Sequence, residues 1–131
     1  MISIVIVSHS SKVAEGVKEL AEQVSQKRIK VFAAGGVDDQ TIGTNVERIY
    51  EALLEATKDD GALVLLDLGS AILSAQMAVE MLPEDKQARV TLSEAPLVEG
   101  AIMASVEASL GHEIEKVKVA AEAATSMRKL P

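Results

Sequence analysis

Two residues of the chain could form a reactive pair. His9 is one of two histidines, and it follows an aliphatic run in the stretch ISIVIVSHSSK at positions 2–12. Asp67 ends a second aliphatic run, GALVLLDL at positions 61–68. A carboxylate beside an imidazole accepts a hydrogen bond from one ring nitrogen, which fixes the tautomer and frees the other nitrogen as a nucleophile or base. If these two strand ends meet, we expect Asp67 to orient the ring and His9 to react.

Groups that favour anions are predicted around this pair. Serines follow His9, a glycine and a serine follow Asp67, and two glycines follow another predicted strand. Helix amino termini offer unpaired amides and a favourable dipole, so they would stabilise a phosphoryl group carried on His9. The expected phosphate-binding residues are Ser10, Ser11, Gly36, Gly69 and Ser70. For positions 35–44 (GGVDDQTIGT), a glycine-permitted turn that caps the next helix explains the residues at least as well.

The elements that must position the pair follow from the hydrophobic pattern. Four short strand-like runs, at 2–7, 29–34, 61–68 and 88–93, alternate with helical patterns, which predicts an α/β domain with a mainly parallel sheet. The first and third runs are almost continuously aliphatic and should be central, whereas the other two admit polar residues and should lie nearer the edges. We therefore predict an open sheet of four or five strands in the order 2-1-3-4, with helices on both faces.

This order would bring His9 and Asp67 together. The chain leaves the first and third strands toward opposite edges of the sheet, and the crevice between their carboxyl ends is where open α/β sheets bind ligands. His9 ends the first strand and Asp67 ends the third, so the two side chains should face each other although they are far apart in sequence.

The helical patterns have recognisable ends. The serines that precede Val13 are predicted to cap the first helix, and Thr44 or Asn45 the second. The third should begin at Ser70 and stop at Pro83, and the fourth should begin at Pro96 and end at Gly111. The last helix should begin at about Glu113. Met77, Met81 and Met103 are predicted to fill the core. His112 is expected on the surface, where a helix starts.

Composition excludes several classes of function. The 131 residues fit a single domain, and a net charge of −7 with 2% aromatic residues argues against binding to nucleic acid or a membrane surface. The chain has no cysteine, so thiolate chemistry is excluded and a cytoplasmic location is expected.

The sequence has no P-loop, no dinucleotide fingerprint and no complete G-x-S-x-G elbow. No His, Asp or Glu cluster has metal-ligand spacing, so neither metal nor cofactor is expected.

Four stretches in order support a family resemblance over essentially the whole chain. They are VSHS at 7–10, AAGG with DDQTIGT at 33–44, DLGSA at 67–71 and EAPLVEGA at 94–101. This combination resembles the phosphotransferase subunit of bacterial phosphoenolpyruvate-dependent dihydroxyacetone kinase, whose phosphocarrier domain is similar to the mannose-type IIA domain of the sugar phosphotransferase system. The resemblance implies one such phosphocarrier domain over residues 1–131.

The resemblance also implies roles and partners. His9 would be phosphorylated by the histidine phosphocarrier protein HPr and would pass the group to ADP in the nucleotide-binding subunit of the kinase. Nε2 is the expected atom, because Asp67 would hold the other ring nitrogen. Asp67 matches the aspartate that supports the histidine in mannose-type relatives. A homodimer is implied too, and the apolar, Ala-rich helices after position 96 are compatible with one. Since the chain ends at Pro131, the phosphocarrier would be a separate protein that docks transiently.

Two alternatives remain open at the level of sequence. The chain could be a mannose-type IIA component for sugar uptake, although DLGSA and EAPLVEGA look more like the dihydroxyacetone branch. It could also be a non-catalytic module whose crevice holds an anion. Labelling with a phosphoryl group would separate the last interpretation from the other two.

Overall fold

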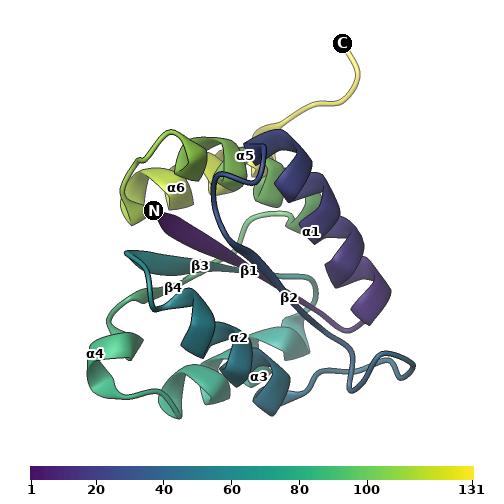
Figure 1. Ribbon diagram of the computed structural model, residues 1–131. Coiled ribbons are helices and arrows are strands. Elements are labelled where there is room, and N and C mark those ends of the chain that lie inside the picture. Colours follow the sequence, from purple (N-terminus) through teal and green to yellow (C-terminus); the bar gives the residue numbers. More distant parts are fainter.

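The sheet has four parallel strands in the order β2-β1-β3-β4, which confirms the predicted order. The computed structural model describes all residues from 1 to 131. The strands are β1 (Ile2–Ser8), β2 (Val31–Gly35), β3 (Gly61–Leu66) and β4 (Val90–Ser93). Figure 1 shows β1 and β3 in the middle of the sheet, in agreement with their continuous aliphatic runs.

Helices cover both faces of the sheet, as predicted (Figure 1). On one face lie α1 (Ser11–Ser25), α5 (Leu97–Ser109) and α6 (Ile114–Ala123), and on the other lie α2 (Val46–Ala56) and α3 (Gly69–Glu80). The short helix α4 (Glu84–Gln87) precedes β4, and a 3₁₀ turn, η1 (Ala124–Ser126), follows α6. The sequence does not predict α4, because one turn is too short to show a helical period.

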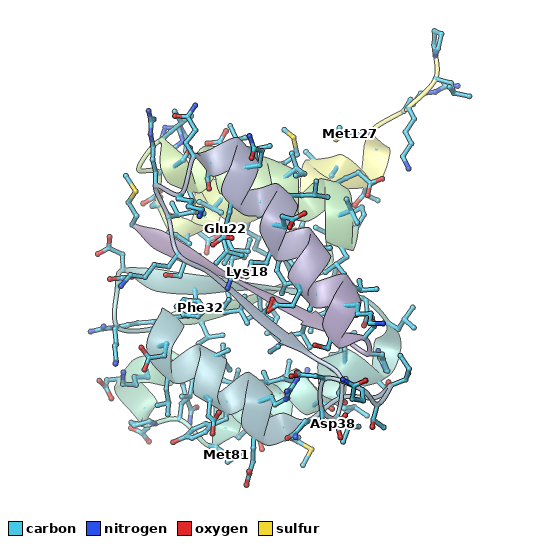
Figure 2. All side chains as sticks on the ribbon, turned by 45° about the vertical axis from the view of Figure 1, so that its right-hand side comes forward. Lys18, Glu22, Phe32, Asp38, Met81 and Met127 are labelled. Carbon is cyan, nitrogen blue, oxygen red and sulfur yellow. The ribbon has the colours of Figure 1, made fainter.

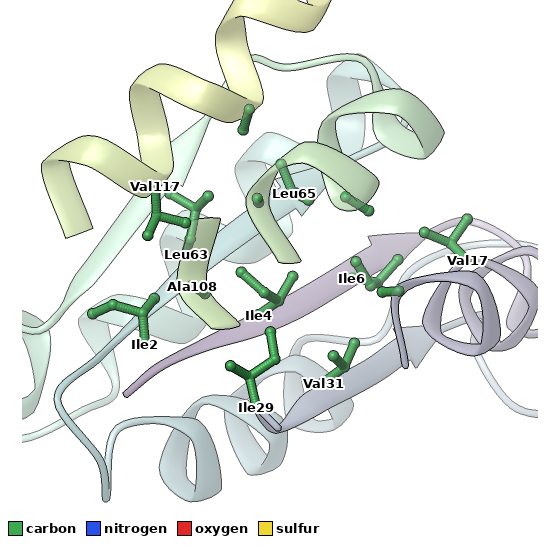
Figure 3. Close-up of a cluster of buried hydrophobic side chains, with 14 of the residues drawn as sticks. Ile2, Ile4, Ile6, Val17, Ile29, Val31, Leu63, Leu65, Ala108 and Val117 are labelled. Carbon is green, nitrogen blue, oxygen red and sulfur yellow. The ribbon is translucent and has the colours of Figure 1, made fainter. Parts of the chain in front are cut away.

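Two hydrophobic cores, one on each face, explain the composition of β1. Ile2, Ile4 and Ile6 point into the core under α1, α5 and α6, which Figure 3 shows, whereas Val5 and Val7 point into the core over α2 and α3. Successive side chains of a strand face opposite sides, so a strand covered on both faces must be aliphatic at every position. Each fully buried side chain of this size contributes roughly 1.5–3 kcal/mol.

Helix caps agree with the sequence in two cases and differ in a third. Ser10 caps α1 by accepting a hydrogen bond from the amide of Val13, and the side chain of Asn45 caps α2. Contrary to the prediction, Ser70 does not cap α3, because the helix already begins at Gly69 and its cap position, Leu68, provides no side-chain hydrogen bond. The Ser70 hydroxyl is therefore free to act elsewhere.

The predicted burial of two methionines was wrong. Met77 and Met81 are exposed, and Figure 2 shows Met81 at the outer edge of the helical layer formed by α2 and α3. The inner face of α3 is built from alanines (Ala71, Ala75 and Ala78), which let the helix approach the sheet closely. Large side chains are consequently left on its outer face. Met103 is partly buried.

Candidate active site at the carboxyl ends of β1 and β3

The parallel register of the two central strands brings His9 and Asp67 together. Val7 of β1 lies opposite Leu66 of β3, and the next residue, Asp67, donates its amide N–H to the carbonyl of Val7 at 3.2 Å. Parallel strands end at the same edge, so the residues that follow them share one crevice. The predicted encounter between the strand ends is therefore present in the structure.

Asp67 is saturated with hydrogen bonds, two of which come from His9. Its Oδ1 accepts from the imidazole Nδ1 of His9 at 2.9 Å and from the amide of Leu68 at 2.7 Å. Its Oδ2 accepts from the backbone N–H of His9 at 2.9 Å and from the hydroxyl of Ser8 at 2.8 Å. The side chains of His9 and Asp67 keep 20% and 17% of their surface exposed. The carboxylate thus holds both the ring and the backbone of His9.

These contacts determine the charge of Asp67 and the tautomer of His9. Burial by itself raises the pKa of the Asp67 carboxyl group, but the hydrogen bonds from His9, Ser8 and Leu68 outweigh it. The pKa of Asp67 therefore lies below its ordinary value of 3.8, and the group is ionised at neutral pH. An ionised carboxylate only accepts hydrogen bonds, so Nδ1 of His9 carries the proton and Nε2 of the neutral ring has a free lone pair.

Ser70 faces the other ring nitrogen. Its Oγ lies 2.5 Å from Nε2 of His9, at the amino end of α3. Since Nε2 carries no proton in the neutral ring, the hydroxyl of Ser70 is the donor. The sequence places Ser70 among the phosphate-binding candidates but gives no signal of this direct contact with the imidazole.

The other phosphate-binding candidates lie around the start of α1. The hydroxyl of Ser10 caps α1, and the N–H of Gly36 donates to the carbonyl of Ser8 at 3.1 Å. The hydroxyl of Ser11 lies 3.5 Å from a carboxylate oxygen of Asp39. The functional groups of Ser10 and Gly36 thus serve the local structure, whereas Gly69 and Ser70 begin a helix whose first amides have no partner within it.

A loop between β2 and α2, residues 36–45, closes over the backbone of His9. The amide of Gly43 donates to the carbonyl of His9 at 2.8 Å. Arg48 of α2 secures the loop, because its guanidinium donates to the carbonyl of Gly35 and to Asp39, both at 2.7 Å. Sequence reasoning did not single out Arg48 or Ser8, because helix and strand patterns carry no signal of these long-range contacts.

Two hollows lie near the carboxyl ends of the strands. One, of about 490 Å³, adjoins Asp67, and Leu68, Ile72, Leu92 and Leu97 are among its lining residues. Another, of about 380 Å³, lies over the edge strand β2, and Lys18, Phe32 and Arg48 are among the residues that line it. Figure 2 shows Lys18 and Phe32 on this side of the molecule. Asp67 lines the first hollow, whereas neither His9 nor Asp67 lines the second.

The second histidine lies apart from this site. His112 is partly buried beside the first residues of the chain, at the other end of β1, and its Nδ1 pairs with the carboxylate of Glu107. The helix after it begins at Ile114, with Glu113 in the cap position. No group of three or more His, Asp or Glu side chains could hold a metal ion. None of the helices is both long and apolar enough to cross a membrane.

Comparison with known proteins shows the family of the chain. Residues 3–118 match the EIIA-man family, described as PTS system fructose IIA component. The chain is 45% identical over 120 residues to the "PEP-dependent dihydroxyacetone kinase, phosphoryl donor subunit DhaM" of Escherichia coli (strain K12). This match covers 89% of the chain but 25% of the relative, so the chain spans about a quarter of that protein's length.

Other relatives match over most of their own length. The chain is 37% identical to the "PEP-dependent dihydroxyacetone kinase 2, phosphoryl donor subunit DhaM" of Listeria innocua, and the match covers 89% of the chain and 94% of the relative. A solved structure described as "Crystal structure of unknown function protein EF1359" superposes with a TM-score of 0.85 at 33% identity, covering 98% of each chain. The chain belongs to the EIIA-man family, in the branch of the DhaM phosphoryl donor subunits.

Proposed function

We propose that the chain is a phosphocarrier that accepts a phosphoryl group on Nε2 of His9 and passes it on within a dihydroxyacetone kinase. The donor is HPr, and the acceptor is ADP bound in the nucleotide-binding subunit. The observation that carries this proposal is the imidazole of His9, fixed through Nδ1 by an ionised Asp67 while Nε2 points to the exposed Ser70 at the start of α3. The DhaM relatives, named as phosphoryl donor subunits, support the same role.

The transfer needs no acid or base from this chain. The lone pair of Nε2 attacks phosphorus, and the bond between phosphorus and the donor's nitrogen breaks, with its electron pair remaining on the donor. The Nδ1 proton of His9 stays in place, hydrogen-bonded to Asp67. The phosphorylated ring gains positive charge, which the adjacent carboxylate stabilises. In the second transfer an ADP oxygen attacks phosphorus, and the electron pair of the broken bond returns to Nε2.

The amino end of α3 is the proposed phosphate site. The first amides of α3, at Gly69 and Ser70, have no partner within the helix and would donate to phosphoryl oxygens. We propose that Ser11, at the start of α1, offers its amide in the same way. Ser10 and Gly36 support the site structurally, since the Ser10 hydroxyl and the Gly36 amide are already bonded within the chain.

Labelling with purified partners tests this function. The chain is incubated with phosphoenolpyruvate, enzyme I and HPr, and then with the nucleotide-binding kinase subunit and ADP. We expect a base-stable, acid-labile phosphate on the wild type, its transfer to ADP, and no label on His9→Ala. The substitution should leave the fold intact, because His9 lies beyond the end of β1, and circular dichroism checks this. Equal labelling of His9→Ala would refute the assignment.

A sugar-uptake IIA component is the second candidate, because the matched family is described as a PTS system fructose IIA component. The same labelled protein separates the two. Transfer to a sugar-specific IIB domain, without transfer to ADP in the kinase subunit, would favour uptake. The absence of any label would instead favour an anion-binding module.

In either phosphoryl-transfer role we propose the cytoplasm as the location, where the phosphoryl donor and ADP would be available.

We also propose that the chain forms a homodimer through the outer face of α3. Leu73 and Met77 on this face are 65% and 56% exposed, and Glu80 is the only charged residue of the helix. A chain with a net charge of −7 repels a second copy over most of its surface, so an uncharged apolar face is where self-association costs least. The alanines of α5 mostly face the core and are less suited to this role.

A further inference from the structure

The hydroxyl of Ser70 is hydrogen-bonded to the atom that is proposed to react. We propose that this hydroxyl works in two positions: in the resting protein it donates to Nε2 of His9 and shields the nucleophile, and in the phosphorylated protein it turns to donate to a phosphoryl oxygen. Ser70 would thereby lower the reactivity of the free histidine and lengthen the life of the phosphohistidine. The second position rests on the proposed function, whereas the first follows from the resting geometry.

The resting position follows from the hydrogen bonds around the ring. Asp67 is ionised and already accepts from Nδ1, so the neutral imidazole has one remaining lone pair, on Nε2. Oγ of Ser70 lies 2.5 Å from Nε2 and makes no other hydrogen bond within the chain. The hydroxyl proton therefore points along the lone pair that any electrophile must use.

The second position follows from sterics. A phosphorus atom bonded to Nε2 must occupy the space on the ring nitrogen that the Ser70 hydroxyl now fills. Ser70 is exposed in the first turn of α3, and an exposed side chain changes rotamer within nanoseconds. Having turned aside, the hydroxyl remains beside the new phosphoryl group and can donate to one of its oxygens. The amides of Gly69 and Ser70 belong to the same first turn of α3.

The step balances without any change in the protonation of serine. The Ser70 proton stays on Oγ throughout, and only its acceptor changes, from the Nε2 lone pair to a phosphoryl oxygen. The Nε2 lone pair forms the new bond to phosphorus, while the donor's leaving nitrogen keeps the electron pair of the broken bond. When the phosphoryl group leaves for its acceptor, the lone pair returns to Nε2 and the hydroxyl can donate to it again.

The two positions predict separate effects of Ser70→Ala on two different rates. Loss of a hydrogen bond of this type changes a rate by roughly 2- to 10-fold. Without the hydroxyl, the free imidazole should react faster with a general electrophile by about that factor. The phosphohistidine should be hydrolysed faster by a similar factor, because one donor to the phosphoryl oxygens is lost.

The first arm measures the free nucleophile without any phosphate. Diethyl pyrocarbonate acylates unprotonated imidazole, and mass spectrometry of peptides separates modification of His9 from that of His112. We expect His9 of Ser70→Ala to react about 2- to 10-fold faster than in the wild type. Ser70→Thr, which keeps the hydroxyl, should restore the slow rate. A rate for Ser70→Ala equal to or below the wild-type rate would overturn the shielding position.

The second arm measures the lifetime of the phosphohistidine. Phosphoramidate phosphorylates histidine chemically, so no partner protein is needed, and the loss of the label from His9 is followed at neutral pH. We expect Ser70→Ala to lose its phosphate about 2- to 10-fold faster than the wild type, and Ser70→Thr to match the wild type. Equal lifetimes of the wild type and Ser70→Ala would overturn the phosphate-binding position.

Ser74 provides the matched control, because it lies on the same helix but pairs with Thr44 and not with His9. Ser74→Ala should change neither rate, and a change equal to that of Ser70→Ala would refute a specific role for Ser70. If the wild type took no phosphate on His9 from either phosphoramidate or HPr, the proposed function and the second position would both fall. The acylation arm would still decide the shielding position, so the two failures are distinguishable.

Discussion

At the scale of residues, the candidate site depends on four hydrogen bonds to one carboxylate. Asp67 accepts from both the ring and the backbone of His9, and also from Ser8 and Leu68. The two carboxylate oxygens therefore hold the ends of two strands together as well as the imidazole ring. A side chain that both builds the crevice and orients the proposed nucleophile should affect activity and stability together.

Asp67→Asn is expected to reduce stability in a pH-dependent way. The pKa of Asp67 is lower in the folded protein than its ordinary value of 3.8, which we take for the unfolded chain. The ionised group therefore stabilises the fold at pH values above that pKa. This contribution is lost as the pH falls below that value and through the folded pKa. The difference in unfolding free energy between the wild type and Asp67→Asn, measured with urea, should therefore narrow as the pH is lowered from about 4 toward about 2.

The same variant should accept phosphoryl groups more slowly, because the ring loses its charged partner. A stability difference that stays constant or widens over that acidic range would contradict the assigned hydrogen bonds. Unchanged transfer kinetics would show that Asp67 does not support the reaction.

At the scale of elements, close approach between α1 and β2 fixes the position of the segment that carries His9. A Cβ atom on Gly35 would overlap the carbonyl oxygen of Ser10 and would lie 2.7 Å from the Cβ of Ala14. A glycine is therefore required where β2 ends against the first turn of α1. Gly16, by contrast, lies in the middle of α1, and a Cβ atom added there would have no neighbour within 4 Å. Two glycines of adjoining elements thus have opposite requirements.

Replacing each of these glycines by alanine should change stability in opposite directions. Gly35→Ala should destabilise the protein by about 1–3 kcal/mol, because α1 must move away from β2. Gly16→Ala should stabilise it by about 0.5–1 kcal/mol, because alanine restricts the unfolded chain and favours the helix. Thermal or urea unfolding measures both, and each variant serves as the control for the other. Destabilisation by Gly16→Ala would indicate that another surface packs against it.

At the scale of the whole molecule, the outer face of α3 exposes several large apolar side chains that the packing of a single chain leaves uncovered. Leu68, Ile72, Leu73, Met77 and Met81 are exposed together on or beside one helix that adjoins the candidate site. A surface helix normally carries polar residues on its outer side, and this one carries Gln76 and Glu80 among apolar neighbours. The pattern suits a surface that is covered in solution.

If the chain forms the proposed dimer, Leu73→Lys or Met77→Lys should shift it to the monomer. Each substitution places a charge in an apolar contact that, in a two-fold dimer, occurs twice, so its effect is doubled. Sedimentation equilibrium of the wild type and both variants measures the change. Lysine at Leu20, an exposed position on α1 across the sheet, is the matched control and should leave the dimer intact. A monomeric wild type, or dissociation by the Leu20 variant alone, would refute the α3 interface.

The sequence by itself determined the order of the strands and the meeting of His9 with Asp67. Both follow from local patterns: continuous aliphatic runs predict central strands, and in parallel strands the carboxyl ends share one edge. The caps at Ser10 and Asn45 were also predictable, because a cap depends on neighbours within one turn.

Only the tertiary structure decided which atoms surround the imidazole and which helix face is left exposed. Ser70 contacts Nε2 because α3 begins two residues earlier than a cap at Ser70 would imply, which places the predicted capping residue inside the first turn. Ser8 and Arg48 act through contacts between distant segments, and no local period encodes such contacts. Met77 and Met81 point outward because alanines take the inner face of α3. Hydrophobic patterning indicates that a helix packs, but close packing against the sheet decides which of its apolar faces is buried.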